Sequence, residues 1–270
     1  MRFVLLHYHF LKNAGMTVFA FLMRSFGDGC AEVDTPDRDG HVACADLLAL
    51  LERKPEVKAV TSHQIRYPVP AVPGYIFFDL CFLRDPIDRL RSMYYYFRAK
   101  PQPGDPVSDF ACSSGMGDFL AQMVDRMPWY IADAQVNLIA NGIANDIPTE
   151  HDLERALARV LNTSFLGVVD MYTESLIAGQ YFLNPVFPEL DCAERPVNVS
   201  RGMEKTLAAR VAEVEAACDP AVWAEVLRLN RLDLRLLETA RGEVARRLSC
   251  VPPGAAERLR RQLAGATASG

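Results

Sequence analysis

The feature that most constrains the fold is an apolar run, Tyr75–Leu83, that passes directly into Arg84-Asp85-Pro86. A strand that is apolar almost throughout is typical of a sheet covered by helices on both faces. Aspartate is a good helix N-cap, and proline suits the first position of a helix, so a helix should begin at Pro86. Strand, turn and helix in this order predict parallel strands and an α/β fold.

The start of the chain repeats this order. Residues 3–9 form an apolar run that closes in polar residues, residues 10–16 suit a turn, and residues 17–26 have a helical apolar pattern that ends at Gly27. Two further strands are predicted at 57–61 and 165–169, and helices dominate from residue 101 onward. The other predicted helices span 42–53, 86–98, 116–126, 129–141, 151–162, 172–183, 203–217 and 220–247. We therefore predict an α/β fold with a P-loop-like parallel sheet flanked by helices and a mostly helical C-terminal half.

One domain should include residues 1–250, because a chain of 270 residues with half of them hydrophobic can bury one large core. Residues 251–270 lack a continuous apolar face and are predicted to form a flexible tail.

Composition excludes several classes of protein. A net charge of −5 argues against non-specific binding to nucleic acid, which requires a basic surface. The seven cysteines are scattered, odd in number and form no CxxC pair, so neither a disulfide framework nor a zinc site is expected. The apolar run at residues 3–6 is far too short to span a membrane or to form a signal peptide. These features predict a cytoplasmic protein and leave its oligomeric state open.

The turn before the first helix has the composition of a phosphate-binding loop. Small residues let the main chain approach a ligand, and the first N–H groups of the following helix can bind an anion. A lysine adds charge and a threonine adds a hydroxyl donor. The Walker pattern GxxxxGK[ST] is absent, which disfavours a kinase or ATPase. The predicted binding residues are Lys12, Asn13, Ala14, Gly15, Met16 and Thr17.

A second candidate lies at the end of the central strand. Arg84 stands where ligands bind to open α/β sheets, and Ser92 follows about two helical turns later. A guanidinium group and a hydroxyl can together hold one phosphate. Arg84 could equally form an ion pair with Asp85 or Asp88.

Together these segments resemble the sulfotransferases that use 3′-phosphoadenosine-5′-phosphosulfate (PAPS), in particular the heparan sulfate 2-O-sulfotransferases and bacterial relatives. Residues 9–17 are similar to that family's 5′-phosphosulfate loop. Residues 84–92 match its 3′-phosphate motif R-D-P-x-x-R-x-x-S at every fixed position. The resemblance spans about residues 3–240.

The resemblance implies roles for individual residues. Lys12 would stabilise the departing phosphate oxygen, Arg84 and Ser92 would hold the 3′-phosphate, and His63, after the strand 57–61, would be the catalytic base. A structural loop histidine is the alternative for His63, and we interpret His9 as packing at the strand end or as loop support. The remaining candidates are Ser200 and Arg201 as nucleotide contacts, and Gln135 and Asn137 as acceptor contacts or, alternatively, polar residues on a solvated helix face.

We therefore expect an enzyme that transfers the sulfuryl group of PAPS to an acceptor hydroxyl and uses no metal ion. The branch resembled favours carbohydrate or glycoconjugate acceptors, whereas a lipid, a peptide tyrosine or a metabolite stays open. The alternatives are a non-catalytic nucleotide-binding module of the same fold and a small-molecule kinase.

Overall fold

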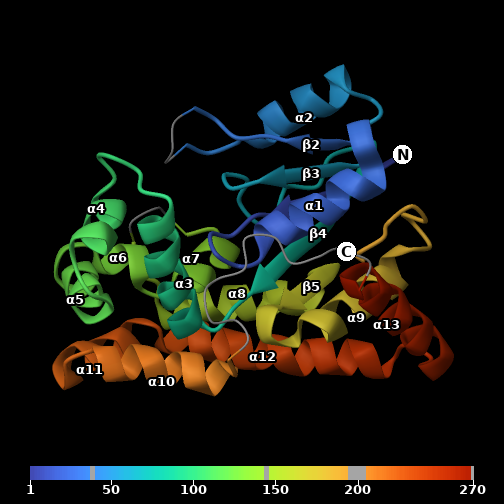
Figure 1. The fold of residues 1–270 in the computed structure, drawn as a ribbon. Helices are drawn as coiled ribbons and strands as arrows, with labels where there is room; N and C mark the ends of the chain where they lie inside the picture. The colour runs from blue at the N-terminus through green and yellow to red at the C-terminus, as the bar shows by residue number, and fades with distance from the viewer. Residues whose placement is uncertain (37–39, 143–145, 194–204, 269–270) are drawn as a thin grey trace. The chain divides into compact units, whose positions relative to one another are not determined.

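The computed structural model describes residues 1–36, 40–142, 146–193 and 205–268, and Figure 1 shows the fold. Within these residues, all strands are parallel and form one sheet in the order β2-β3-β1-β4-β5. The strands are β1 (Arg2–Tyr8), β2 (Cys30–Glu32), β3 (Ala59–Ser62), β4 (Tyr75–Leu83) and β5 (Phe165–Val168).

The register of the sheet aligns the carboxyl ends of its three central strands. Tyr8 of β1 pairs with Ser62 of β3 on one side and with Cys81 of β4 on the other. The chain runs from β1 to β2 and β3 on one side of β1 and then crosses to β4 on the other side. Ligands of open α/β sheets bind at the carboxyl ends of the strands where the order reverses in this way.

Helices account for most of the remaining described chain. They are α1 (Gly15–Phe26), α2 (Cys44–Arg53), α3 (Pro86–Ala99), α4 (Pro106–Ser113), α5 (Met116–Arg126), α6 (Pro128–Ile131), α7 (Ala134–Ala140), α8 (Glu150–Asn162), α9 (Tyr172–Leu183), α10 (Leu207–Ala217), α11 (Pro220–Leu229), α12 (Arg231–Ser249) and α13 (Pro253–Ala268). Two short 3-10 helices occupy Gly27–Gly29 and Val169–Met171. No described helix is long and apolar enough to cross a membrane.

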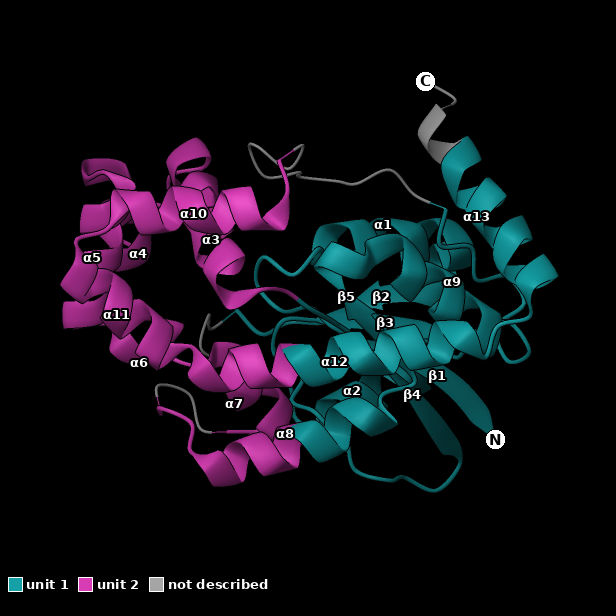
Figure 2. Ribbon diagram, turned by 90° about the horizontal axis from the view of Figure 1, so that it is seen from below, with its two compact units in different colours: residues 1–83, 157–198, 238–270 teal, residues 84–156, 199–237 magenta. Residues whose placement is uncertain are grey.

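The chain divides into two compact units, coloured separately in Figure 2. The first unit comprises residues 1–83, 157–198 and 238–270 and contains the whole sheet. The second unit comprises residues 84–156 and 199–237 and is helical where the structure describes it. The chain passes from the first unit into the second directly after β4, between Leu83 and Arg84, and the single domain predicted for residues 1–250 stays a prediction.

The core of the first unit is built on apolar side chains of the sheet. Phe21 of α1 and Leu176 of α9 join Leu5 of β1 and Leu80 of β4 in one buried cluster, in which Phe165 of β5 also lies. Burying a large apolar side chain stabilises a fold by about 1.5–3 kcal/mol. This cluster therefore holds α1, and with it the loop that precedes α1, on the sheet.

The predicted α/β class and parallel sheet are confirmed, and α5 has the predicted bounds. β2 and α4 were not predicted. The predicted helix 129–141 is two helices, α6 and α7, because Asp133 adopts a left-handed conformation with φ of 44°. The predicted helix 220–247 is likewise divided into α11 and α12 at Asn230, whose side-chain amide donates to the carbonyl of Val226.

The C-terminal segment differs from the flexible tail that the sequence predicted. α13 packs against α9 through Ala255, which is buried, and through Leu259 and Leu263, which are partly buried, and Val251, just before α13, is buried in the same cluster. Residues spaced by four lie on the same side of a helix, so Ala255, Leu259 and Leu263 form a narrow apolar stripe. The stripe is too narrow to look like a continuous face in the sequence, yet it is wide enough to pack on one helix.

Candidate functional site

The loop between β1 and α1 has an unusual main-chain conformation. Lys12 and Ala14 adopt left-handed conformations with φ of 66° and 63°. This region costs a residue with a side chain about 1–2 kcal/mol, and such conformations concentrate at functional sites. Two of them within three residues make this loop a candidate functional site.

A glycine is required where this loop enters α1. A Cβ atom added to Gly15 would lie 1.8 Å from Cδ2 and 2.1 Å from Nε2 of His9. The imidazole of His9 therefore packs directly on the first turn of α1. This contact agrees with the interpretation of His9 as a residue that supports the loop.

The loop is also tied to the neighbouring strand. Asn13 is 1% exposed, and its side-chain Nδ2 donates to the carbonyl of Phe82 at 2.8 Å. Phe82 is the penultimate residue of β4, two positions before Arg84 in the chain. A buried hydrogen bond thus fixes the loop after β1 to the end of β4.

The first turn of α1 can receive an anion. Ala14 is the N-cap, and its methyl side chain cannot accept hydrogen bonds from the N–H groups of the first turn. Helix N–H groups without a capping side chain attract negative charge. Thr17 is buried in this turn, whereas Met16 is 42% exposed.

Three histidines from β1, the loop and the end of β3 stack upon one another. The rings of His7 and His9 lie 5.1 Å apart, and those of His9 and His63 lie 3.9 Å apart. Burial, together with the neighbouring His63, lowers the pKa of His9 to about 3. Burial and the charges of His9 and His63 also hold the pKa of His7 well below its usual value. His7 and His9 therefore remain neutral at physiological pH.

His63 is the exposed member of this stack, and its ring orientation is fixed. Its Nδ1 lies 2.7 Å from the carbonyl oxygen of His9, which can only accept a hydrogen bond. In neutral His63 the proton therefore resides on Nδ1, and Nε2 has a lone pair that can accept another proton. Asp34 holds the main chain here, because its Oδ1 accepts from the N–H of His63 at 2.9 Å and from the hydroxyl of Ser62 at 2.8 Å.

In the second unit, the main chain of Arg84 is held by a side-chain amide. Oε1 of Gln135 accepts from the N–H of Arg84, and Nε2 of Gln135 donates to the carbonyl of Arg84, both at 2.9 Å. Asp233 in turn accepts from Nε2 of Gln135 at 3.1 Å. Since Gln135 is 1% exposed, this network is buried.

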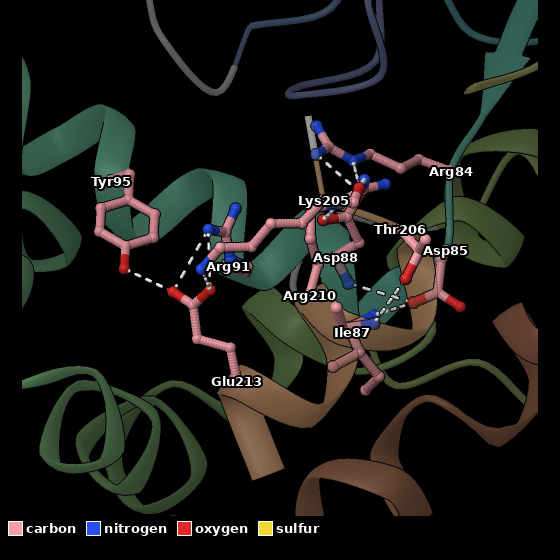
Figure 3. Close-up of polar contacts among 11 residues, drawn as sticks. Arg84, Asp85, Ile87, Asp88, Arg91, Tyr95, Lys205, Thr206, Arg210 and Glu213 are labelled. Carbon is pink, nitrogen blue, oxygen red and sulfur yellow. Dashed lines mark hydrogen bonds and ion pairs between the residues drawn. The ribbon is translucent and has the colours of Figure 1, made fainter. Parts of the chain in front are cut away.

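The Arg84 guanidinium group forms a buried ion pair with Asp88. Its Nε and Nη2 both lie 2.8 Å from Oδ2 of Asp88. Arg210 of α10 donates to the same carboxylate, from Nε to Oδ1 at 2.7 Å and from Nη2 to Oδ2 at 3.1 Å. Figure 3 shows Arg84 and Arg210 directed at Asp88 from different segments of the chain. Of the two pairings considered from sequence, the structure contains the one with Asp88.

The neighbouring residues of the motif shape the start of α3. Asp85 caps this helix, as the sequence predicted, by accepting from the N–H groups of Ile87 and Asp88 at 3.0 Å. Ser92 lies two turns along α3 and is 1% exposed. Arg89 is also buried. Burial lowers the pKa of Arg89, and the charge of Asp233 partly opposes this shift.

The structure thus brings the predicted residues together in two groups. In the first unit, the loop Lys12–Thr17 and His63 belong to one assembly around His9. In the second unit, Arg84 and Gln135 are hydrogen-bonded, and Asn137 donates its amide to the carbonyl of Asp146 at 3.0 Å. Acceptor contacts by Gln135 and Asn137 stay predictions. Ser200 and Arg201 lie outside the described residues.

Sequence reasoning missed several residues that these contacts reveal. Arg210 is separated from Asp88 by 122 positions, and Asp34 precedes the His63 main chain by 29 positions. A lone arginine on an amphipathic helix and a lone aspartate in a loop have no local pattern that marks them. Pairing at this distance can be recognised only after the chain has folded.

Comparison with known proteins finds a distant relative by sequence. An uncharacterized protein of Archaeoglobus fulgidus is 22% identical over 243 residues, which cover 88% of this chain and 95% of the relative. No family model matches the chain. The similarity extends over nearly the whole of both chains, so it includes both units of the fold.

Proposed function

We propose that this protein is a PAPS-dependent sulfotransferase that transfers a sulfuryl group to an acceptor hydroxyl. The observation that supports the proposal most is the strained loop Lys12–Gly15, which leads into an uncapped helix and is tied by Asn13 to the end of β4. Arg84, the first residue of the resembling 3′-phosphate motif, follows that strand directly. The two phosphate-binding motifs of the resemblance thus begin at the carboxyl ends of adjacent strands.

The residues present have the chemistry that PAPS requires. Main-chain N–H groups at the start of α1, with Lys12 and Thr17, would bind the 5′-phosphosulfate. Arg84 and Ser92 would bind the 3′-phosphate, since a guanidinium group and a hydroxyl both donate to phosphate oxygens. Contacts from Ser200 and Arg201 are part of the proposal. The transfer itself needs no metal ion if Lys12 stabilises the charge that develops on the leaving phosphate oxygen.

His63 is the proposed base. The hydrogen bond from its Nδ1 to the carbonyl of His9 leaves Nε2 able to accept a proton. The acceptor oxygen attacks sulfur, its proton passes to Nε2 of His63, and the bond from sulfur to the bridging phosphate oxygen breaks. That oxygen retains the electron pair, and the nucleotide product is 3′-phosphoadenosine-5′-phosphate (PAP). The His63 imidazole also stacks on the ring of His9, with the ring centroids 3.9 Å apart.

The acceptor is proposed to be a hydroxyl of a carbohydrate or glycoconjugate, with Gln135 and Asn137 as candidate contacts. No nucleic-acid partner is proposed, given the net charge of −5. The seven scattered cysteines suit a reducing compartment, so the proposed location is the cytoplasm.

Isothermal titration with PAP and with ATP tests the proposal. We expect PAP to bind in the low-micromolar range or tighter and ATP to bind much more weakly, because ATP has no 3′-phosphate. Equal affinities would contradict the assignment and favour a kinase. Tight PAP binding without turnover of any hydroxyl acceptor would favour a nucleotide-binding module.

A further inference from the structure

The turn that follows β3 is fastened to the loop that follows β2. In that loop, Asp34 accepts at Oδ1 from the hydroxyl of Ser62 at 2.8 Å and from the main-chain N–H of His63 at 2.9 Å. Gln64 makes the reverse connection, because its side-chain amide accepts from the N–H of Thr35 and donates to the carbonyl of Thr35. One side chain from the loop and one from the turn therefore hold the two segments together.

The hydroxyl of Ser62 has a defined role in these contacts. Ser62 is the last residue of β3 and is 2% exposed. Its Oγ accepts from the N–H groups of Gln64 and Ile65, both at 2.9 Å, so its own proton is donated to Asp34. Hydrogen bonds to a carboxylate are stronger than hydrogen bonds between neutral groups. Asp34 thus holds the residue before His63 directly and the two residues after it through the Ser62 hydroxyl.

The other side of the same turn is held by the end of β1. The N–H of His9 donates to the carbonyl of Ser62 at 2.9 Å, and Nδ1 of His63 lies 2.7 Å from the carbonyl oxygen of His9. A carbonyl oxygen only accepts, so this second contact requires a proton on Nδ1. His63 is therefore held through its main chain by Asp34 and through its ring by His9. The ring can reach the carbonyl of His9 only while the main chain stays in place.

We propose that Asp34 is a positioning residue, which holds the main chain at His63 so that the imidazole keeps its proton on Nδ1 and its lone pair on Nε2. A base must present its lone pair within hydrogen-bonding distance of the proton that it accepts. A misplacement of about 1 Å at a reacting group can cost a hundredfold in rate. The catalytic consequence rests on the proposed function, in which His63 is the base, whereas the effect of Asp34 on the ring does not.

The test is the tautomer of His63, read by nitrogen NMR on protein labelled with nitrogen-15 in its five histidines. Spectra are recorded at about pH 9, above the usual histidine pKa of about 6.5. The signals of His63 are those that disappear in His63→Gln. We expect the wild type to have the proton of His63 on Nδ1, and Asp34→Ala to show a mixture of both tautomers, because its main chain no longer holds the ring against His9.

Three further variants show whether the acceptor oxygen of Asp34 is responsible. Asp34→Asn keeps an Oδ1 acceptor, so His63 should keep its proton on Nδ1. Asp28→Ala is the matched control, because it removes another exposed carboxylate of the first unit and should give the wild-type tautomer. Ser62→Ala removes the hydroxyl that connects Asp34 to the turn and should give a mixture. If Asp34→Ala does not fold, Ser62→Ala decides by the same criterion.

Two results would overturn the inference. One is an Nδ1 tautomer that persists unchanged in both Asp34→Ala and Ser62→Ala, since the turn would then hold His63 without the carboxylate. The other is a shift in Asp34→Asn as large as that in Asp34→Ala, since the acceptor oxygen would then not be what fixes the ring.

Turnover of an identified acceptor separates this inference from the proposed function. Asp34→Ala should lower turnover by about tenfold and change PAP affinity by less than about twofold, because the proton of the acceptor moves only during transfer. In a His63→Ala background, Asp34→Ala should cause no further loss, since Asp34 acts through His63. A further loss there would contradict the positioning role. A wild-type chain without turnover contradicts the proposed function, while the tautomer of His63 still decides the role of Asp34.

Discussion

The loop region of the first unit and the arginine cluster of the second unit are suited to anions by different physical means. The loop relies on its main chain, with left-handed Lys12 and Ala14 leading into an uncapped helix. The cluster relies on side-chain charge, and it comprises three buried arginines and the carboxylates that pair with them, Arg84, Arg91, Arg210, Asp88 and Glu213. Near the loop, the buried titratable groups His7 and His9 are held neutral, whereas in the cluster Glu213 is held ionised.

Under the proposed function, this difference implies a division of labour. Main-chain N–H groups and a histidine whose Nδ1 is held by a hydrogen bond suit a place where charge develops and a proton moves during a reaction. Fixed cations suit a group whose charge stays the same before and after the reaction, because they contribute equally to the ground state and the transition state. Substitutions in the first region should therefore alter turnover, and substitutions in the second should alter affinity.

The largest expected effect concerns His63. If His63 is the base, His63→Ala should reduce turnover by about a hundredfold or more while PAP affinity stays nearly unchanged, because proton removal occurs only as the acceptor attacks. The wild-type rate should fall at low pH, where a protonated imidazole cannot accept a proton. The measurements are turnover of an identified acceptor across pH and PAP affinity by titration.

Two controls sharpen this prediction. His151→Ala removes a histidine that is 74% exposed on α8 and should leave turnover unchanged. Lys12→Ala should lose both PAP affinity and rate, because the charge of Lys12 would contact the phosphosulfate in the ground state and in the transition state. A His63→Ala enzyme with near wild-type turnover and the same pH dependence would move the base elsewhere, with His9 as the next candidate.

The next effect tests the cluster. Arg84→Ala should weaken PAP by about thirtyfold to a hundredfold, equivalent to about 2–3 kcal/mol, and adenosine 5′-phosphosulfate far less. Arg98→Ala is a suitable comparison, because Arg98 lies on α3 and donates to the main-chain carbonyls of Ala111 and Ser114. A uniform loss for both nucleotides would mean that Arg84 supports the fold and does not bind the 3′-phosphate.

Short-range sequence patterns predicted those strands and helices whose bounds depend on residues close together in the chain. The apolar run before Asp85-Pro86 predicted β4 and the start of α3, and the spacing of apolar residues predicted α5. The candidate loop was found because its small residues stand between a strand and a helix. Its left-handed conformations at Lys12 and Ala14 could not be predicted, since neither residue type favours them.

Contacts between distant residues account for what the sequence did not predict. Asp133 caps α12 by accepting from the N–H groups of Leu232 and Asp233, both at 2.8 Å, and Asp233 caps α7 in return. These partners are about a hundred positions apart, so nothing near either aspartate marks a helix boundary. The same reasoning applies to Gln135, which was predicted to contact the acceptor or, alternatively, to lie on a solvated helix face. The alternative is wrong, because Gln135 is buried against the main chain of Arg84.

The smallest expected effect is a pH dependence of the free energy of unfolding, caused by Asp133 in this pair of capping aspartates. It tests whether the second unit also contains a buried group that is held neutral. Burial and the neighbouring charge of Asp233 raise the pKa of Asp133 to about 7. In the unfolded chain an aspartate titrates near pH 4, as its usual pKa of about 3.9 indicates. Between these values the folded protein binds a proton that the unfolded chain has lost, so the contribution of Asp133 to stability is full below about pH 4 and is lost as the pH rises through about 7.

Urea unfolding of the wild-type protein and of Asp133→Asn at pH 5 and pH 8 measures this contribution. Asparagine keeps the Oδ1 acceptor for Leu232 and Asp233 but cannot ionise. The free energy of unfolding of the wild type should therefore fall relative to the variant, by on the order of 2 kcal/mol between the two pH values. Asp109→Asn, which changes an exposed carboxylate of α4, should follow the wild type at both pH values. If the wild type and Asp133→Asn change in parallel, Asp133 is ionised throughout and makes no pH-dependent contribution to stability.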